Sequence, residues 1–209
     1  MRKSRGLLLI VSGASGTGKG TVCRQLLDSE PNLLYSISAT TRAPRDGEQH
    51  GKEYFFFSKE QFREKIDAGD FLEYADVYGN YYGTMKSWVN NRLDEGRDVL
   101  LEIDTQGALN VKKACPEGVF IFLLPPSIEE LKQRIIGRGT ETQESLARRL
   151  SSAPNEIDIG RQYNYVVVND TIERAVDKIR AIMVAEHCRA ERCEDKFAAL
   201  KSELGDVVS

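Results

Sequence analysis

Residues 7–21 read LLLIVSGASGTGKGT, and this stretch decides the fold expected for the chain. Its aliphatic start, residues 7–11, is too short to span a membrane and suits a strand buried on both faces of a parallel sheet. A glycine-rich turn follows at once, and then a helix begins. The spacing Gly13-x4-Gly18-Lys19 is typical of a loop whose backbone N–H groups converge on phosphate oxygens beside a helix N-terminus. The stretch therefore predicts a phosphate-binding loop.

The side chains of this loop specify its chemistry further. Lys19 would supply a mobile cation for a transferred phosphate. Gly20 stands where a Ser or Thr usually contacts Mg²⁺, and Thr21 brings the hydroxyl one residue later. A Gly/Ser/Thr-rich segment alone is often only a surface loop, but strand, spacing, lysine and helix coincide here. We expect nucleotide phosphates to be bound by Gly13, Ala14, Ser15, Gly16, Thr17, Gly18, Lys19, Gly20 and Thr21.

The composition is that of an ordinary globular protein and argues against several classes. The 209 residues suffice for one substantial core. With 29 basic and 32 acidic residues the net charge is −3, so no global basic field points to nucleic acid. The basic residues 1–5 precede an apolar run, but that run leads into the loop without a small-residue cleavage site. We therefore expect a cytoplasmic protein without a membrane partner.

The cysteines and histidines show no ligand pattern. The four cysteines form no Cys-x-x-Cys pair, and reduced cysteines that pack inside or at helix ends are the expectation. Surface or capping roles are expected for the two histidines rather than catalysis. These residues are Cys23, Cys115, Cys188, Cys193, His50 and His187.

Strands and helices alternate along most of the chain, which predicts a parallel α/β sheet with right-handed crossovers. Buried-strand patterns lie at 99–104, 119–124 and 165–170, and a long helix is expected from about 172 into the 190s. A capping box, Ser127-x-x-Glu130, is typical of a helix start. Arginines around Gly137-Arg138-Gly139 would ordinarily be a solvated helix face, but in a phosphate-loop protein they suit a lid over residues 131–150.

Residues 36–88 differ from the flanking segments in their aromatic and polar content, and we predict a small α+β insertion there. Short strands are expected at 33–38 and 54–57. A second capping box, Ser58-x-x-Gln61, predicts a helix that ends near Gly69. Residues 71–84 read as a hairpin turning at Gly79-Asn80, followed by a helix over about 85–95.

Seven further motifs follow one another along nearly the whole chain. They are Ser38-x-Thr40-Thr41-Arg42-x-Pro44-Arg45, Gly51-Lys52-x-Tyr54-Phe55, Phe71-Leu72-Glu73, Gly79-Asn80-Tyr81-Tyr82-Gly83-Thr84, Asp104-x-Gln106-Gly107, Gly137-Arg138-Gly139-Thr140 and Val168-Asn169-Asp170. In content, order and spacing they resemble guanylate kinase, a P-loop nucleoside monophosphate kinase. The resemblance is far more specific than the phosphate loop alone.

The resemblance implies an α/β fold of three parts. A P-loop NTPase-type parallel sheet flanked by helices would form the core, from residues 1–35, 89–130 and 151–209 with a C-terminal helix. An inserted α+β region, residues 36–88, would bind GMP. Residues 131–150 would form a helical lid.

The resemblance also implies a set of GMP-binding residues. Planar guanidinium groups and phenol hydroxyls suit a phosphate dianion, and a carboxylate can accept both adjacent donors of guanine, N1–H and the exocyclic amine. Adenine would leave that carboxylate unpaired, and such sites can reject the wrong partner by factors on the order of 10⁴. Tyr74 and Tyr81 are expected only to pack in the core. The phosphate would contact Arg42, Arg45, Tyr54 and Tyr82, and the base Glu73, with Ser38 and Thr84 as hydroxyl partners and Asp104 nearby.

On the ATP side, the resemblance adds Arg134, Arg138 and Asn169 to the loop residues, with Mg²⁺ as the cofactor. Asp104 would lie between the nucleotides, so Thr21 and Asp104 are the candidate metal residues, while Glu102 stands where the family often has Asp. The attacking GMP phosphate is already ionised and needs no general base, so catalysis would be alignment and charge neutralisation. The catalytic residues would be Lys19, Arg42, Arg138 and Arg149.

The expected function is therefore phosphoryl transfer from ATP to GMP, giving ADP and GDP, in purine nucleotide metabolism and GMP recycling. Its partners would be these substrates, and the choice between GMP and dGMP stays open. Two alternatives stay open at this point. One is another nucleoside monophosphate kinase, suggested by the Gly-Lys-Gly-Thr ending of the loop. The other is a non-catalytic guanylate-kinase-like module that binds proteins. The sequence leaves the oligomeric state undetermined.

Overall fold

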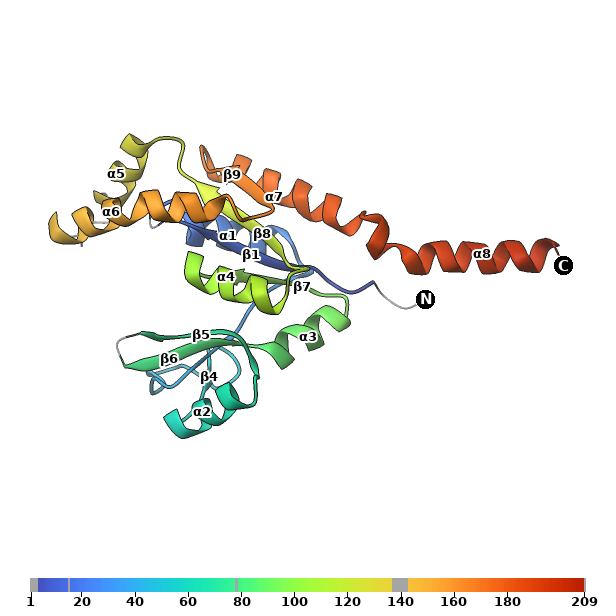
Figure 1. Cartoon of the computed structure of the whole chain (residues 1–209), viewed down its shortest axis with the longest axis horizontal. Helices are drawn as coiled ribbons and strands as arrows, with labels where there is room; N and C mark the ends of the chain where they lie inside the picture. Colours follow the sequence, from blue (N-terminus) through green and yellow to red (C-terminus); the bar gives the residue numbers. More distant parts are fainter. Residues whose placement is uncertain (1–3, 15, 78, 137–142, 209) are drawn as a thin grey trace.

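Two separate β-sheets organise the chain in the computed structural model, which describes residues 4–14, 16–77, 79–136 and 143–208 (Figure 1). The larger sheet has five parallel strands in the order β2-β7-β1-β8-β9, with β1 (Leu8–Gly13) at its centre. The prediction of a parallel α/β sheet is confirmed. The other strands are β2 (Leu33–Tyr35), β7 (Asp98–Glu102), β8 (Val119–Leu124) and β9 (Tyr165–Val168).

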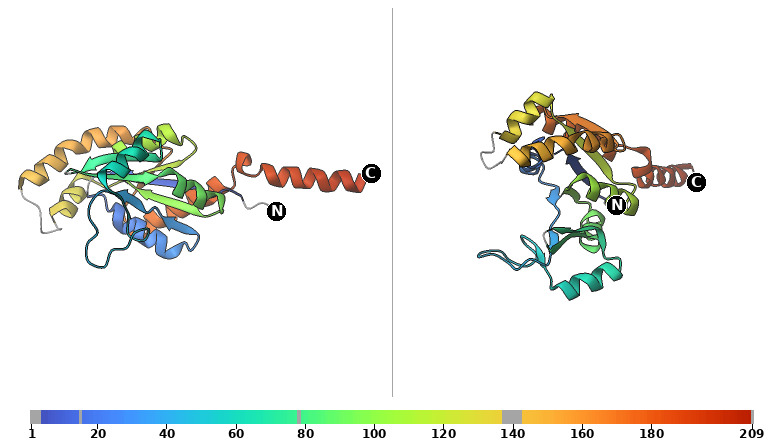
Figure 2. Two further views of the ribbon diagram at one scale, coloured as in Figure 1. Left: turned by 90° about the horizontal axis from the view of Figure 1, so that it is seen from below. Right: turned by 60° about the vertical axis from the view of Figure 1, so that its left-hand side comes forward.

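Helices cover both faces of this sheet because its strands are apolar on both sides. Leu7, Leu9 and Val11 pack with α1 (Lys19–Ser29) and α7 (Ile172–His187). Leu8 and Ile10 point the opposite way and pack with α3 (Lys86–Asp94) and α4 (Thr105–Ala114). Side chains alternate along a strand, so the unbroken aliphatic run of β1 supplies both cores. The two views of Figure 2 show these layers from other sides.

The smaller sheet has four strands in the order β4-β3-β6-β5 and lies apart from the larger one, with α4 between them (Figure 1). Its hairpin, β5 (Phe71–Val77) and β6 (Asn80–Met85), confirms the predicted one. Helix α2 (Lys59–Asp67) starts with the predicted capping box, and its Phe62 ring stacks on Phe71 and Tyr81. The remaining strands are β3 (Ser38–Thr40) and β4 (Phe55–Phe56).

The single strand expected at 33–38 is wrong, because the chain crosses from one sheet to the other within it. Strand β2 ends at Tyr35, and the Ser36 amide donates the last hydrogen bond to Leu100 O of β7. Two residues later, Ser38 pairs with Thr84 in the smaller sheet. The hydrophobic alternation continued through the crossing and gave no sign of it.

The long helix expected from 172 into the 190s is also wrong. Helix α7 ends at His187, Arg189 takes an extended backbone, and a short 3-10 helix, η1 (Ala190–Arg192), leads into α8 (Glu194–Val208). No Gly or Pro marks this break. At Ser127 only half of the capping box forms, because the Glu130 carboxylate binds Arg134 instead of returning to the cap. Tyr74, expected in the core, is 46% exposed, whereas Tyr81 packs as predicted.

The segment predicted to be a lid, residues 131–150, includes most of one helix and the start of another. They are α5 (Ile128–Ile136) and α6 (Gln143–Gly160). The motif Gly137-Arg138-Gly139-Thr140 lies outside the described residues, so the lid stays a prediction. Among the described helices, none combines the length and apolar character that a membrane span needs.

Candidate active site

The phosphate loop leads from buried β1 to the first turn of α1, as the sequence predicts. Gly18 caps α1 in the left-handed conformation, with φ of 87°, and a Cβ there would lie 2.6 Å from Asn169 Nδ2. Asn169 is buried and donates from Nδ2 to Thr17 O at 2.7 Å, so the end of β9 braces the loop. Ser15 lies outside the described residues. The loop therefore requires glycine at position 18 for conformation and for space.

Lys19 reaches back across the loop. Its Nζ donates to Gly13 O at 2.6 Å. Burial lowers the pKa of this ammonium, and the nearest carboxylates, led by Glu102 and Glu156, oppose that effect. Glu156, on α6, did not stand out in the sequence, because an acid on an amphipathic helix carries no signal of its own. The loop thus holds a desolvated positive charge where a phosphate would sit.

Glu102, the last residue of β7, lies beside the glycine that replaces the usual hydroxyl residue. A Cβ at Gly20 would lie 3.5 Å from Glu102 Oε1. Burial raises the pKa of the Glu102 carboxyl, and Lys19 counteracts this. Thr21 is exposed on α1, and the Asp104 carboxylate is engaged as the N-cap of α4, accepting from Gly107 N at 2.7 Å. Glu102 is therefore the carboxylate that lies beside Gly20 of the loop.

The smaller sheet places three predicted base-binding residues in one row. Ser38 of β3 pairs with Thr84 of β6, which in turn pairs with Glu73 of β5. A bulge between Phe71 and Glu73 shifts the register, which sets Glu73 opposite Thr84 while Leu72 stays in the core. Three strands thus bring a carboxylate and two hydroxyls together. The sequence placed these residues in one site but carried no sign of the bulge.

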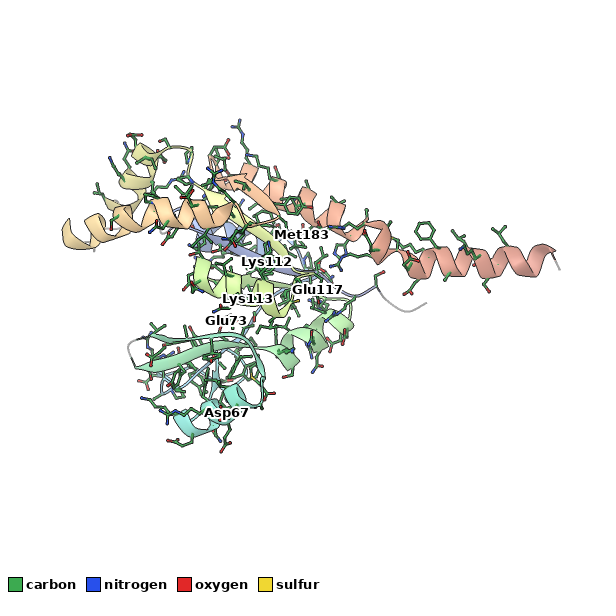
Figure 3. All side chains as sticks on the ribbon, in the orientation of Figure 1. Asp67, Glu73, Lys112, Lys113, Glu117 and Met183 are labelled. Atoms are coloured by element: carbon green, nitrogen blue, oxygen red, sulfur yellow. The ribbon has the colours of Figure 1, made fainter. Side chains whose placement is uncertain are left out.

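Glu73 lies on the side of this sheet that faces α4 (Figure 3). Thr84 Oγ1 donates to Glu73 Oε1 at 2.7 Å, which leaves the other oxygen unused by this bond. Burial raises the pKa of the Glu73 carboxyl, and the Thr84 hydrogen bond opposes the rise. A cavity of about 250 Å³ opens here. It is lined by residues that include Ser38, Glu73, Tyr82, Asp104, Gln106 and Gly107.

Arg42 lies among the aromatic residues predicted with it. Its guanidinium carbon is 5.4 Å from the Tyr54 ring centroid, and the Tyr54 and Tyr82 rings are 6.1 Å apart. Arg42 Nη2 donates to Glu48 Oε1 at 2.9 Å, and Glu48 Oε2 accepts from Arg45 N at 2.7 Å. Hydrogen bonds to Arg42 and to the Arg45 amide hold the pKa of Glu48 below its usual value. The Arg45 side chain is exposed.

Glu48 is a residue of this site that the sequence analysis missed. Its backbone N–H also closes a turn onto Arg45 O at 3.0 Å, with Gly47 at φ of 87° inside the turn. The ion pair with Arg42 is only 18% exposed on each side. An acid three residues after Arg45, across an Asp-Gly turn, was the available signal.

The two halves of the site meet at the start of α4. A Cβ on Gly107 would lie 3.4 Å from Asp104 Oδ1 and 3.5 Å from Glu73 Oε2. Asp104 also acts electrostatically on both Glu73 and Lys19. Because β1 and β7 are neighbouring parallel strands, the phosphate loop after β1 and Asp104 after β7 lie at the same edge of the sheet.

Comparisons with known proteins show the family of the chain. The guanylate kinase family model matches residues 5–186. A guanylate kinase of Clostridium tetani is 59% identical over 200 residues, 96% of both chains, and one of Caldanaerobacter subterraneus subsp. tengcongensis is 55% identical over 201 residues, 96% of this chain and 98% of the relative. The chain belongs to the guanylate kinase family. A crystal structure of guanylate kinase from Anaplasma phagocytophilum covers 92% of both chains at 37% identity, with a TM-score of 0.68.

Within this guanylate kinase fold, two hydrogen bonds hold Arg134, which is predicted to bind ATP. It donates to Asn169 O and to Glu130 Oε1, each at 3.1 Å, and so joins α5 to the end of β9. The Asn169 side chain supports the loop through Nδ2, and its Oδ1 has no hydrogen-bond partner among the described residues. The adenine contact of Asn169 stays a prediction. Arg138 and the Arg149 side chain lie outside the described residues. Their roles in this guanylate kinase stay predictions.

Proposed function

We propose that the phosphate loop and the Glu73 pocket carry the two substrates of the guanylate kinase reaction, the transfer of the γ-phosphoryl group from ATP to GMP. The observation that carries this assignment is that Asp104, which lines the Glu73 pocket, follows β7 at the same edge of the sheet where the loop follows β1. Two nucleotides bound there would point their phosphates toward each other. Alignment of this kind is the main catalytic contribution available in phosphoryl transfer.

The GMP side reads the base and holds the phosphate separately. Glu73 Oε2 and the oxygen shared with Thr84 accept the two guanine donors, while Ser38 and Thr84 border the base. The phosphate contacts Arg42, Tyr54 and Tyr82, which the structure groups, and Arg45 swings in from the surface. Adenine presents an acceptor where guanine has N1–H, so it leaves Glu73 unpaired.

The ATP side consists of the loop amides, Lys19 and Arg134. Lys19 exchanges its bond to Gly13 O for a phosphate oxygen, which compensates its burial. Mg²⁺ bound with ATP would neutralise phosphate charge. The described residues contain no group of three or more His, Cys, Asp or Glu side chains that could hold a metal, so the ion depends on the ATP phosphates and on Glu102 beside the loop. Glu102 is proposed in addition to Thr21 and Asp104, which stay the predicted metal residues.

The remaining organisation follows the three-part scheme. Residues 36–88 deliver GMP, residues 1–35, 89–130 and 151–209 form the ATP-binding core, and residues 131–150 supply Arg138 and Arg149 to the moving phosphoryl group. The GMP phosphate attacks as an anion, so no residue acts as a general base. Arg42, Lys19 and the two lid arginines would offset charge in the transition state.

The test is ADP release with ATP and Mg²⁺ in separate reactions with GMP, AMP, CMP and UMP. The wild-type chain should use GMP, and Glu73→Gln should lower kcat/KM for GMP by about 10²-fold, because the amide replaces one acceptor with a donor. Glu60→Gln, on exposed α2, is the matched control and should behave as wild type. Preference for another monophosphate would overturn the guanine assignment, and an unchanged Glu73→Gln would overturn the role of Glu73.

A further inference from the structure

Helix α8 carries an exposed apolar stripe. The helix projects away from both sheets, as Figure 1 and the left view of Figure 2 show. Phe197, Leu200 and Leu204 on it are 52%, 59% and 63% exposed. Large apolar side chains gathered on one helix face are typical of a protein contact.

The stripe has the spacing of a coiled-coil seam. Cys193, at the end of η1, precedes Phe197, Leu200 and Leu204 by steps of four, three and four residues. In a heptad these four residues take positions d, a, d and a. Such a seam fits another helix of the same kind rather than a flat surface.

The charges beside the seam indicate which helix fits. Lys196 and Glu203 occupy the g positions, and Glu194 and Lys201 the e positions. Among the described residues, none of these four side chains forms an ion pair within the chain. In an antiparallel pair g faces g and e faces e, whereas in a parallel pair g faces e.

We propose that α8 pairs antiparallel with α8 of a second copy of this chain. Layers of a and d residues then join Phe197 to Leu200 of the other copy, and Cys193 to Leu204, each twice by two-fold symmetry. In this register Lys196 faces Glu203 and Glu194 faces Lys201, again twice each. Each of the four seam residues then packs against a seam residue of the other copy. Each of the four flanking charges faces a charge of opposite sign.

Other arrangements of the same helices fit less well. A parallel pair sets Lys196 against Lys201 of the other copy. An antiparallel pair shifted by one heptad, with Leu200 against Leu204, sets Lys201 against Lys201 and Glu203 against Glu203. Like charges at such positions oppose pairing and select against these registers. The seam is short, so the association belongs to the weak, concentration-dependent class.

The first test is sedimentation velocity of the full chain at low salt, over about 1 to 200 µM, where a weak pair should dissociate on dilution. Lys196→Glu and Glu203→Lys should each weaken dimer formation about tenfold, and the double variant should restore it. Both single changes improve the charge match to the α8 dipole, so lost pairing would not reflect a melted helix. A chain that is monomeric throughout, or a dimer that neither single variant weakens, would overturn the proposal.

The second test reads the register by oxidation. In a Cys188→Ser background, Leu204→Cys should form a disulfide with Cys193 of the other copy, because these positions share a layer; Cys23 and Cys115 are buried. Ala199→Cys, on the outer side of the helix, is the matched control and should give little dimer. A disulfide that joins the introduced thiols of the two copies to each other, or equal yields from both variants, would contradict the antiparallel register. Retained phosphoryl transfer to GMP shows that the variants are folded.

Discussion

Lys19 holds a positive charge at a position where burial disfavours it. The charge is useful only when a phosphate is present, so Lys19→Met should abolish turnover while sparing the fold. We expect kcat to fall by at least about 10³-fold and the free energy of unfolding to change by less than about 1 kcal/mol. Initial rates with saturating GMP and urea unfolding measure the two effects. Near-normal turnover would contradict the phosphate-loop assignment.

Glu73 should give GMP binding a dependence on pH. Burial raises the pKa of its carboxyl above the ordinary value of 4.5. In the proposed GMP site, only the deprotonated carboxylate would accept both guanine donors. As the pH falls, the carboxyl of Glu73 becomes protonated at a higher pH than an exposed glutamate does. KM for GMP should therefore start to rise while the pH is still above 4.5. Glu73→Gln has nothing to titrate and should remove this dependence. An identical KM profile for both proteins would assign the dependence to another group.

Glu48 ties Arg42 to the turn that carries Arg45, and so sets the spacing of the two arginines proposed to bind the GMP phosphate. Glu48→Gln replaces one acceptor with a donor that faces a guanidinium or an amide N–H. KM for GMP should rise about tenfold with a smaller change in kcat, because the contact positions a binding group. Glu53→Gln is the control, since Glu53 accepts from the backbone N–H of Gln49 in the same loop and binds neither arginine in the part of the chain that the structure describes. A lower KM would mean instead that Glu48 competes with the phosphate.

At the level of elements, the end of β7 packs beside the first turn of α1, where Gly20 has no side chain. Gly20 leaves room for the Glu102 carboxylate, 3.5 Å from where a Cβ would lie, so a hydroxyl at position 20 would share that space. Glu102→Gln should therefore weaken Mn²⁺ binding to the ATP complex about tenfold, measured by electron paramagnetic resonance of free Mn²⁺. Gly20→Ser in that variant should restore part of the affinity by supplying an oxygen. Full Mn²⁺ affinity in Glu102→Gln would place the metal elsewhere.

How far the sequence predicted these elements depended on whether their signals were local. Strand β8 was predicted as observed, since Gly118 and Pro125 bound its apolar run. The crossing at Ser36 was missed because its cause is pairing with two different sheets. The bulge at Leu72 was missed for the same reason. The other site residues were predicted from the motif resemblance. Glu48 and Glu156 were not predicted, because only the fold brings them close to Arg42 and Lys19.

On the scale of the whole molecule, Asp98 joins three distant parts of the chain. This residue, at the start of β7, is 3% exposed. Its Oδ1 accepts from Leu7 N at 2.7 Å, and its Oδ2 lies 2.9 Å from His187 Nε2 at the end of α7. The contact fixes the start of β1 and the end of α7, from which η1 and α8 continue. The Asp98 carboxylate therefore stabilises the core and fixes the end of α7, from which the C-terminal helices leave the core.

Asp98→Ala should lower the free energy of unfolding by about 2 to 4 kcal/mol, because it leaves a buried amide without an acceptor. Asp98→Asn keeps the acceptor for Leu7 and should cost less. Asp94→Ala is the control, since its ion pair with Arg5 is exposed and should contribute less than about 1 kcal/mol. Urea unfolding of the three variants gives the order, and equal losses from Asp98→Ala and Asp94→Ala would contradict it. The phosphate loop lies at the opposite end of β1, so Asp98→Asn should leave KM for both substrates unchanged.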